Sequence, residues 1–165
     1  MSKRFPFPNP VNETSARLVA AGVVAIGATY LLTGSTLVLV ALAYGFAVRV
    51  ATGPAFSPLA QLATRVITPR LKVTHKFVPG PPKRFAQTVG LIFASAALVL
   101  ALLDNSGAAR IVIAALIFAA ALESILAICL GCIMFSLLIK IGMIPQRICE
   151  ACNDITLRAP AETSS

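Results

Sequence analysis

No charged residue interrupts residues 18–48, which read LVAAGVVAIGATYLLTGSTLVLVALAYGFAV. The stretch is too long for a single membrane crossing, because a helix spans a hydrocarbon core of about 30 Å with about 20 residues. Thr33-Gly34-Ser35-Thr36 divides it, and a glycine among hydroxyl residues suits a turn better than a helix interior. We therefore predict two spanning helices, at about residues 14–32 and 36–52.

The composition of the whole chain agrees with a membrane protein. Hydrophobic residues make up 58% of its 165 residues and charged residues only 12%, whereas about a quarter of a soluble domain is charged. A soluble globular domain and a disordered chain are both disfavoured by this balance. The chain carries 14 Lys and Arg against 6 Asp and Glu. In so apolar a chain, that excess indicates a membrane protein with a basic cytoplasmic face.

The N-terminus superficially resembles a secretory signal, because Lys3 and Arg4 precede the first apolar run. Three prolines, Pro6, Pro8 and Pro10, crowd the stretch between them. The run is followed by a second apolar run and by no small-residue cleavage site with a polar sequence behind it. We therefore expect the first apolar run to be a retained membrane helix.

The second half of the chain predicts two more spans. Residues 85–103 are uncharged, and Asp104-Asn105-Ser106-Gly107 is typical of a turn. The apolar sequence that follows runs on to residue 144, which as one helix would be roughly 55 Å long. We therefore predict a span at about residues 110–131, a weak point at Gly131, and an interfacial or protruding segment over 133–144.

The positions of Lys and Arg test this count. With four spans they all fall on one side of the membrane except Arg110, and the basic side is the cytoplasmic one. A three-span arrangement, with one tilted helix over 18–48, would lose this asymmetry. The prediction is an all-α, four-span protein of the inner membrane with both termini cytoplasmic. Residues 1–13 form an N-terminal segment, 14–144 the membrane domain and 145–165 a tail.

The long connection over residues 53–84 predicts one further helix. Ser57-Pro58 suits a helix start, and apolar residues then recur at helical spacing, namely Leu59, Leu62, Ala63, Val66 and Ile67. We expect a short amphipathic helix in the cytoplasmic interface. The basic stretch behind it fits topology-setting charge, with an acidic partner or anionic lipid as the alternative. His75, the one histidine, is either solvated or a ligand or proton carrier. A nucleic-acid partner is not expected, because no aromatic residues interleave with the basic ones.

All four cysteines lie in two CxxC pairs, Cys129 with Cys132 and Cys149 with Cys152. In the predicted topology both pairs face the cytoplasm, where stable disulfides are rare. The first hypothesis is thiol–disulfide exchange or sulfur relay by Cys129 and Cys132 with a thioredoxin-like protein, since two such thiols form and resolve a mixed disulfide. Cys129 would become nucleophilic if the helix breaks at residues 130–131 and a new one begins there.

Two alternatives compete with redox chemistry. The spacing of Cys129, Cys132, Cys149 and Cys152 also fits a closed four-cysteine zinc site, or one for a softer ion such as Cu(I). The chain would then be a structural or assembly protein without catalysis. Alternatively, Cys129 and Cys132 are small packing residues in a span. No other cofactor is indicated, and the absence of a hydrolase constellation or phosphate loop leaves the protein without an assigned enzyme class.

Glu123 is a carboxylate within the fourth predicted span, and such a group indicates a functional site or a structural ion pair. On a continuous helix it is about 240° from Cys129 and about 180° from Cys132, so it would not share their face. We expect it to meet Arg49, Arg84 or Gln87 instead. A transporter is a weaker alternative, because no second intramembrane ionisable group is evident.

Several segments together resemble a family of bacterial integral membrane proteins known as domain of unknown function 4395. The resembling segments are Asn9–Glu13, Phe46–Arg49, Gly53–Pro58, Pro82–Gly90, Glu123 and Cys129–Cys132. They are spread over most of residues 9–145, and the Pro-Lys-Arg-Phe-Ala-Gln run and the CxGC are the most specific. The resemblance implies a multi-span membrane protein and supplies no activity and no catalytic residues.

Overall fold

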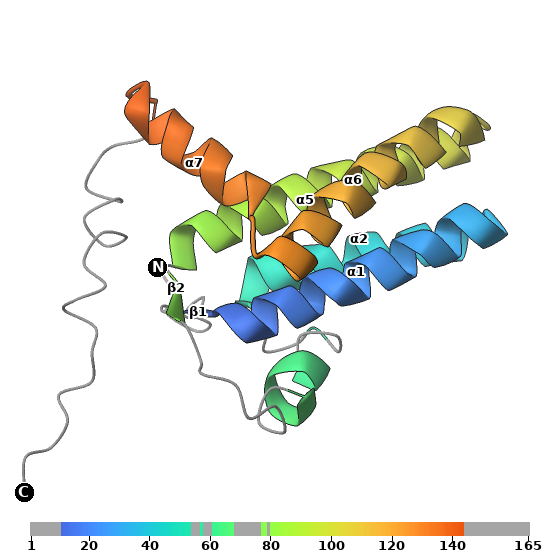
Figure 1. The fold of residues 1–165 in the computed structure, drawn as a ribbon. Helices are drawn as coiled ribbons and strands as arrows, with labels where there is room; N and C mark the ends of the chain where they lie inside the picture. Colours follow the sequence, from blue (N-terminus) through green and yellow to red (C-terminus); the bar gives the residue numbers. More distant parts are fainter. Residues whose placement is uncertain (1–10, 54–56, 58–60, 68–76, 79, 144–165) are drawn as a thin grey trace, which may run out of the picture.

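The computed structural model describes residues 11–53, 57, 61–67, 77–78 and 80–143. Within them lie five α-helices, one π-helical turn and two short strands (Figure 1). In chain order these are β1 (Val11–Asn12), α1 (Glu13–Thr33), α2 (Thr36–Thr52), η2 (Leu62–Ile67), β2 (Phe77–Val78), α5 (Gly80–Leu102), α6 (Ser106–Leu126) and α7 (Leu130–Lys140).

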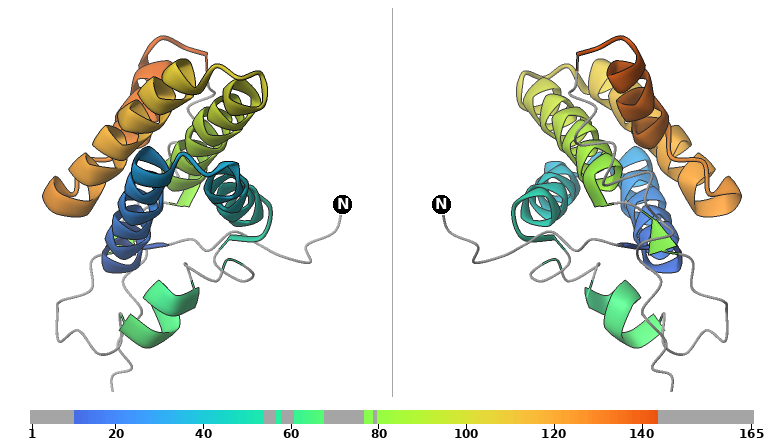
Figure 2. Two further views of the ribbon diagram at one scale, coloured as in Figure 1. Left: turned by 90° about the vertical axis from the view of Figure 1, so that its right-hand side faces the viewer. Right: turned by 90° about the vertical axis from the view of Figure 1, so that its left-hand side faces the viewer.

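Two helical hairpins, α1–α2 and α5–α6, pack into one bundle. Helix α1 lies against α6 and α2 lies against α5, as the views in Figures 1 and 2 show. The turns of both hairpins are at the same end of the bundle. Its core holds Tyr30, Leu39 and Ile113, all fully buried, between small side chains such as Ala94 and Ala97. Small residues let helix backbones approach closely.

The two hairpin turns agree with the sequence prediction. Gly34 has φ 65°, a conformation that glycine adopts without strain, and its N–H donates to the carbonyl of Tyr30 at 2.7 Å. In the second turn Asp104 has φ 59°, and the Asn105 side chain accepts the N–H of Ala108 at 3.2 Å. This N-cap starts α6 at Ser106, whereas the sequence predicted a start near Ala108 or Arg110.

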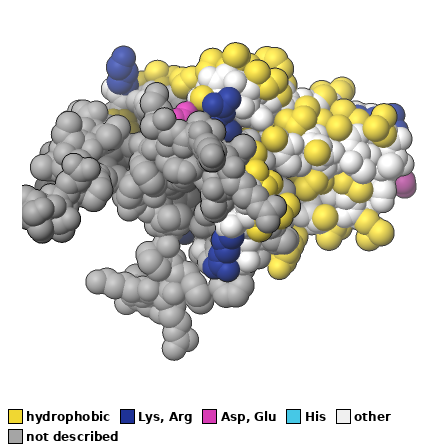
Figure 3. Space-filling model, turned by 60° about the horizontal axis from the view of Figure 1, so that its bottom comes forward, with side chains coloured by type: hydrophobic (Ala, Val, Ile, Leu, Met, Phe, Trp, Pro, Cys, Tyr) yellow, Lys and Arg dark blue, Asp and Glu magenta, His cyan; other side chains and the backbone are white. Residues whose placement is uncertain are grey.

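Among the described residues, three helices are long and apolar enough to cross a membrane: α1, residues 81–102 of α5, and α6. Helix α2 has 17 residues and α7 has 11, so both are shorter apolar helices. The outer surface of the bundle is rich in exposed apolar side chains, including Leu32, Leu37, Ile92, Ile111 and Phe118. Figure 3 shows hydrophobic side chains spread over much of the described part of one face, with few charged ones among them. These features are those of a multi-pass membrane protein.

The predicted span over 110–131 is wrong in its boundary. Helix α6 ends at Leu126 and α7 begins at Leu130, so the break precedes Gly131. Ala127 takes the left-handed conformation with φ 58°, and its N–H donates to the carbonyl of Leu122. After this turn the chain leaves the bundle axis and α7 packs against α5 (Figure 1).

The third helix also begins earlier than predicted. Helix α5 starts at Gly80 and not near residue 85. Pro81 and Pro82 occupy its first turn, where a missing N–H removes no intrahelical hydrogen bond. The earlier start adds Lys83 and Arg84 to the helix, and Lys83 thereby becomes part of the buried end of the bundle.

The predicted amphipathic helix is only partly described. The N–H of Gln61 donates to the carbonyl of Ser57 at 2.8 Å, and η2 follows as one turn. Ala63 is 2% exposed and packs against Val19 of α1. Ahead of α1, β1 pairs antiparallel with β2, Val11 opposite Val78, which was not expected. His75, Cys149, Cys152 and the predicted segments 1–10 and 145–165 lie outside the described residues.

Candidate functional site

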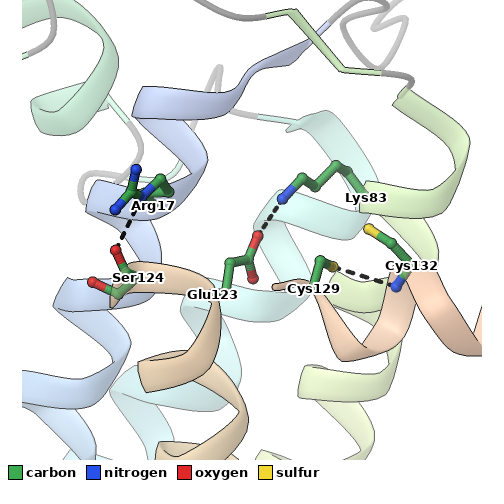
Figure 4. A network of polar contacts seen from close by, with 6 residues as sticks. All are labelled: Arg17, Lys83, Glu123, Ser124, Cys129 and Cys132. Atoms are coloured by element: carbon green, nitrogen blue, oxygen red, sulfur yellow. Dashed lines mark hydrogen bonds and ion pairs between the residues drawn. The ribbon is translucent and has the colours of Figure 1, made fainter. Parts of the chain in front are cut away.

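Polar and reactive side chains gather at the end of the bundle where α6 gives way to α7. We call Lys83, Glu123, Cys129 and Cys132 the junction site (Figure 4). They come from three elements, α5, α6 and α7 with its N-cap. The site therefore exists only when the break after α6 and the early start of α5 are both present.

The two sulfurs are held by the start of α7. Cys129 is its N-cap residue, with extended backbone (φ −93°, ψ 100°), and its Sγ accepts the N–H of Cys132 at 3.3 Å. Cys129 is 9% exposed, and Cys132 is half-buried. A sulfur at a helix N-terminus faces unpaired N–H groups and the positive end of the helix dipole. This is the arrangement that favours a thiolate.

Gly131, between the two cysteines, fixes how closely α7 approaches α5. A Cβ at this position would lie 2.6 Å from Cα of Ala86, which is closer than two carbon atoms approach in proteins. One turn further on, the rings of Phe85 and Phe135 are 5.6 Å apart and tilted. The glycine predicted as a weak point in the helix therefore serves as a packing residue.

Lys83 forms an ion pair with Glu123, and both side chains are largely buried, at 9% and 16% exposure. Two of the expected partners also lie near Glu123: its charge acts on Arg49, and Gln87 lines the same cavity. Nε of Arg49 donates to Oε1 of Gln87 at 2.9 Å, and Nε of Arg84 donates to the carbonyl of Val50 at 3.2 Å. The ion pair with Lys83 was not predicted, because the third helix was expected to begin after that residue.

The angular argument that separated Glu123 from the cysteines is also wrong. It assumed one continuous helix, whereas the turn at Ala127 redirects the chain and brings Cys129 back beside α6. Glu123 and Cys129 line the same cavity, and the charge of Glu123 acts on both thiols. The carboxylate therefore belongs to the site that the sequence assigned to the cysteines alone.

Arg17 of α1 completes the end of α6. Its Nε donates to the carbonyl of Ser124 at 3.0 Å (Figure 4), and its Nη2 donates to the carbonyl of Ile125 at 2.9 Å. The last carbonyls of a helix have no intrahelical partner, and a basic side chain is a favourable one. Arg17 thus helps to end α6 where the junction site requires it.

The environment makes the two thiols unequal. The hydrogen bond with the Cys132 side chain lowers the pKa of Cys129, and the Lys83 charge and the Cys132 N–H act in the same direction against burial. The same interaction and burial raise the pKa of Cys132. Cys129 is therefore the better nucleophile and Cys132 the thiol that retains its proton.

Two cavities meet at Cys129. The inner cavity, about 320 Å³, lies between the helices and has Glu123 and Gln87 at its polar end. The outer groove, about 510 Å³, is lined by Lys83, Cys129 and Cys132 with Ile128, Ile133 and Ser136 among others. Cys129 therefore lines both the outer groove and the inner cavity.

A four-cysteine zinc site, the alternative drawn from the sequence, needs all four sulfurs together. Within the described ranges, no three His, Cys, Asp or Glu residues come close enough to hold a metal ion. Cys149 and Cys152, the other two suggested ligands, lie outside those ranges. Zinc therefore stays a prediction from the spacing alone.

One family model matches most of the chain. Residues 11–140 match the family model described as domain of unknown function (DUF4395), and the chain belongs to this family. No curated protein and no solved structure shows significant similarity to the chain. The match covers the whole described bundle together with the junction site, and it carries no activity.

Sequence reasoning missed one residue of the site, Lys83. The signal that would have found it is Gly80-Pro81-Pro82, because proline favours the first turn of a helix. Starting the helix there places Lys83 one turn before Gln87, on the same face as a residue already considered as a partner for Glu123.

Proposed function

We propose that this protein is a four-span membrane protein whose Cys129–Cys132 pair exchanges disulfides with a thioredoxin-like protein at the cytoplasmic surface. One observation carries the proposal: the Cys129 sulfur caps α7 and accepts the N–H of Cys132, with Lys83 beside the pair. An activated thiol next to a second thiol is the minimum equipment for this exchange.

The hairpin geometry supports the proposal of four spans. Helix α2 has 17 residues, about 26 Å at 1.5 Å per residue, which is the short end of the range for a spanning helix. It returns from the turn at residues 34–35 antiparallel to α1 (Figure 1). If α1 crosses the bilayer, α2 must therefore cross back, and its outward-facing Leu37, Val40 and Tyr44 suit lipid.

The described charges support an orientation with the junction site inside. Arg17, Arg49, Lys83 and Arg84 belong to helix ends at the junction end of the bundle, whereas Arg110 is in the first turns of α6 at the opposite end. Basic residues mark the cytoplasmic side. The proposal thus places the dithiol in the compartment where thioredoxin-like proteins hold cysteines reduced.

The exchange proceeds in two balanced steps. The Cys129 thiolate attacks a disulfide of the partner, forming a mixed disulfide and releasing one partner thiolate. Cys132 then loses its proton and attacks the Cys129 sulfur, forming the Cys129–Cys132 disulfide and releasing the second partner thiolate. Two electrons pass to the partner, the two released thiolates take up protons, and the redox state of the partner sets the direction.

The outer groove is the docking place for the partner disulfide. Cys129 and Cys132 both line it, together with the charged residues Lys83 and Glu13. Its remaining wall is largely apolar, with Ile128 and Ile133 at 40% and 55% exposure. The low exposure of Cys129 restricts attack to a narrow approach, which favours a protruding partner motif over bulk oxidants.

The decisive experiment is mixed-disulfide trapping in a full-length chain that carries Cys149→Ser and Cys152→Ser. Adding Cys132→Ser should trap a thioredoxin-like partner on Cys129, because the resolving thiol is gone. The matched control adds Cys129→Ser instead and should trap far less. The proposal fails if both variants trap equally little and Cys129 reacts with a small alkylating reagent no faster than an unfolded cysteine.

Metal analysis of the wild-type protein, which keeps all four cysteines, tests the structural alternative. The dithiol proposal expects purified wild-type protein to bind no stoichiometric zinc and its thiols to alkylate without a chelator. About one zinc per chain, with thiols that react only after chelation, would replace the exchange reaction by a structural metal site.

A further inference from the structure

The inner cavity lies between the helices of the bundle. Helices α1, α2, α5, α6 and α7 all contribute to its wall, which is mostly hydrocarbon and includes Val19, Val23, Phe46, Phe93, Leu116 and Met134. Its volume of about 320 Å³ lies within the range of small-molecule sites, about 300–1,000 Å³. An occupant must therefore be predominantly apolar and reach the site through lipid.

One end of this cavity is polar. Glu123, Gln87 and Cys129 all lie in its wall. A ligand at this end therefore lies beside the cysteine that the exchange reaction uses.

An unused hydrogen-bond donor lies beside the same end. Arg49 is 5% exposed, and within the described residues its Nη2 has no hydrogen-bond partner. The guanidinium is anchored to two residues of the cavity wall: Nε donates to Gln87 at 2.9 Å, and the group lies 4.5 Å from the ring centroid of Phe46. A buried donor without an acceptor is unfavourable, and a ligand oxygen would satisfy it.

These observations define the ligand by its chemistry. It has an apolar body and at least one carbonyl-type oxygen that accepts hydrogen bonds. It also accepts electrons from a dithiol. We propose that the inner cavity binds a membrane quinone, which takes the two electrons of the Cys129–Cys132 pair. This inference rests on the proposed function, because it supplies the second substrate of the same dithiol.

The redox step balances without a further reactant. Cys129 and Cys132 together lose two protons and two electrons, and one S–S bond forms. The quinone gains the same two protons and two electrons, and its two carbonyl oxygens become hydroxyls. Disulfide exchange at the outer groove then restores the dithiol from a reduced partner, so electrons pass from a cytoplasmic dithiol into the membrane.

A phospholipid chain is the competing occupant, since it would also fill an apolar space between helices. It would leave Arg49 Nη2 without an acceptor, and it would accept no electrons from the thiols. The polar end of the cavity therefore favours the quinone, and displacement of lipid becomes part of the test.

The test uses reduced full-length protein with Cys149→Ser and Cys152→Ser, reconstituted in lipid nanodiscs and mixed with decylubiquinone. We expect saturable quinone reduction with two thiols lost per quinone. Ala119→Leu, which fills the cavity wall, should raise the half-saturating quinone concentration about tenfold or more, equivalent to a loss of about 1.4 kcal/mol. The matched control is Ala114→Leu, an exposed residue of α6 that lines neither cavity; it should leave that concentration unchanged.

Arg49→Gln provides the second arm, because it removes the unpaired donor and should weaken quinone reduction as well. The inference is overturned if quinone oxidises the thiols without saturation, if Ala119→Leu and Ala114→Leu behave alike, or if bound lipid persists under excess quinone. Partner trapping by Cys132→Ser is measured in parallel. Trapping without quinone reduction would reject the quinone and keep the exchange function, whereas thiols inert in both assays would reject both.

Discussion

The two ends of the helix bundle differ in how deeply their charged residues are buried. At the hairpin end, two short turns join the helices, and the charged residues Asp104 and Arg110 are exposed. At the junction end, Arg49 and Lys83 are buried and Glu123 is largely so. Burying charge among apolar residues is unfavourable unless the charges are paired. The contrast indicates that the junction end holds a functional site, whereas the hairpin end only joins the helices.

Breaking the ion pair should give the largest effect. Lys83→Met leaves Glu123 buried without its partner and should lower the free energy of unfolding by roughly 3–5 kcal/mol. Adding Glu123→Gln to Lys83→Met should recover part of the loss, since no isolated charge remains. Chemical unfolding in detergent micelles measures both.

The hairpin end supplies the control for this pair. Asp104→Asn removes an exposed carboxylate and should change stability by no more than about 0.5 kcal/mol. Equal losses for Lys83→Met and Asp104→Asn would contradict the distinction between the two ends.

Glycine packing should give the next largest difference. Gly131→Ala places a methyl group against Ala86, where the backbone of α5 has to move, and should cost about 1–3 kcal/mol. At the hairpin end, the space around Gly107 is open, so Gly107→Ala should be neutral or slightly stabilising. Thermal unfolding compares the two. A harmless Gly131→Ala would show that α7 does not pack tightly on α5.

Two of the residues with positive φ, Ala127 and Gly34, allow opposite substitutions to be compared. Ala127 has φ 58° and Gly34 has φ 65°, a conformation that disfavours any residue with a Cβ by roughly 1–2 kcal/mol. Ala127→Gly should therefore stabilise the protein by up to about 1 kcal/mol, and Gly34→Ala should destabilise it similarly. If Ala127→Gly destabilises instead, the turn after Leu126 has a different conformation.

The smallest expected effect is on the pH dependence of Cys129 alkylation. Because the pKa of Cys129 is lowered, its alkylation should persist at pH values below about 8.5, where an ordinary cysteine is protonated. The negative charge of Glu123 raises the pKa of Cys129, so Glu123→Gln should move the rate profile to lower pH. The Lys83 charge lowers that pKa, so Lys83→Met should move it to higher pH.

Alkylation rates of the Cys129 peptide, followed by mass spectrometry across pH, test both directions. Asp104→Asn should leave the profile in place, because that carboxylate is at the far end of the bundle. Shifts of the same sign in Glu123→Gln and Lys83→Met would refute the electrostatic account.

Sequence patterns were sufficient for the features that depend on local chemistry. The uncharged run over 18–48 and the turn at Gly34 predicted a hairpin, and the structure has it. The turn at residues 104–105 followed from residues that favour turns. Helix existence was therefore predictable, because periodicity and turn residues act within a few positions.

The features that were mispredicted depend on contacts between distant segments. Nothing near Ala127 signals a helix end, since alanine favours helices, and the end is stabilised by Arg17 from another helix. The angular separation of Glu123 from Cys129 failed for the same reason. The pairing of Glu123 with Lys83 could be predicted only if the start of α5 was known. Two prolines indicate that start, but they define it only to within one helical turn.

Arg17 has a consequence for biogenesis. It is 107 and 108 residues away from the two carbonyls that it binds, so translation delivers the guanidinium long before its acceptors exist. In the proposed topology, water at the lipid boundary must solvate it until then, and this holds the first helix at a fixed depth. When the last residues of α6 are made, their carbonyls replace that water. A side chain of the first helix then fixes the end of a helix that is made much later.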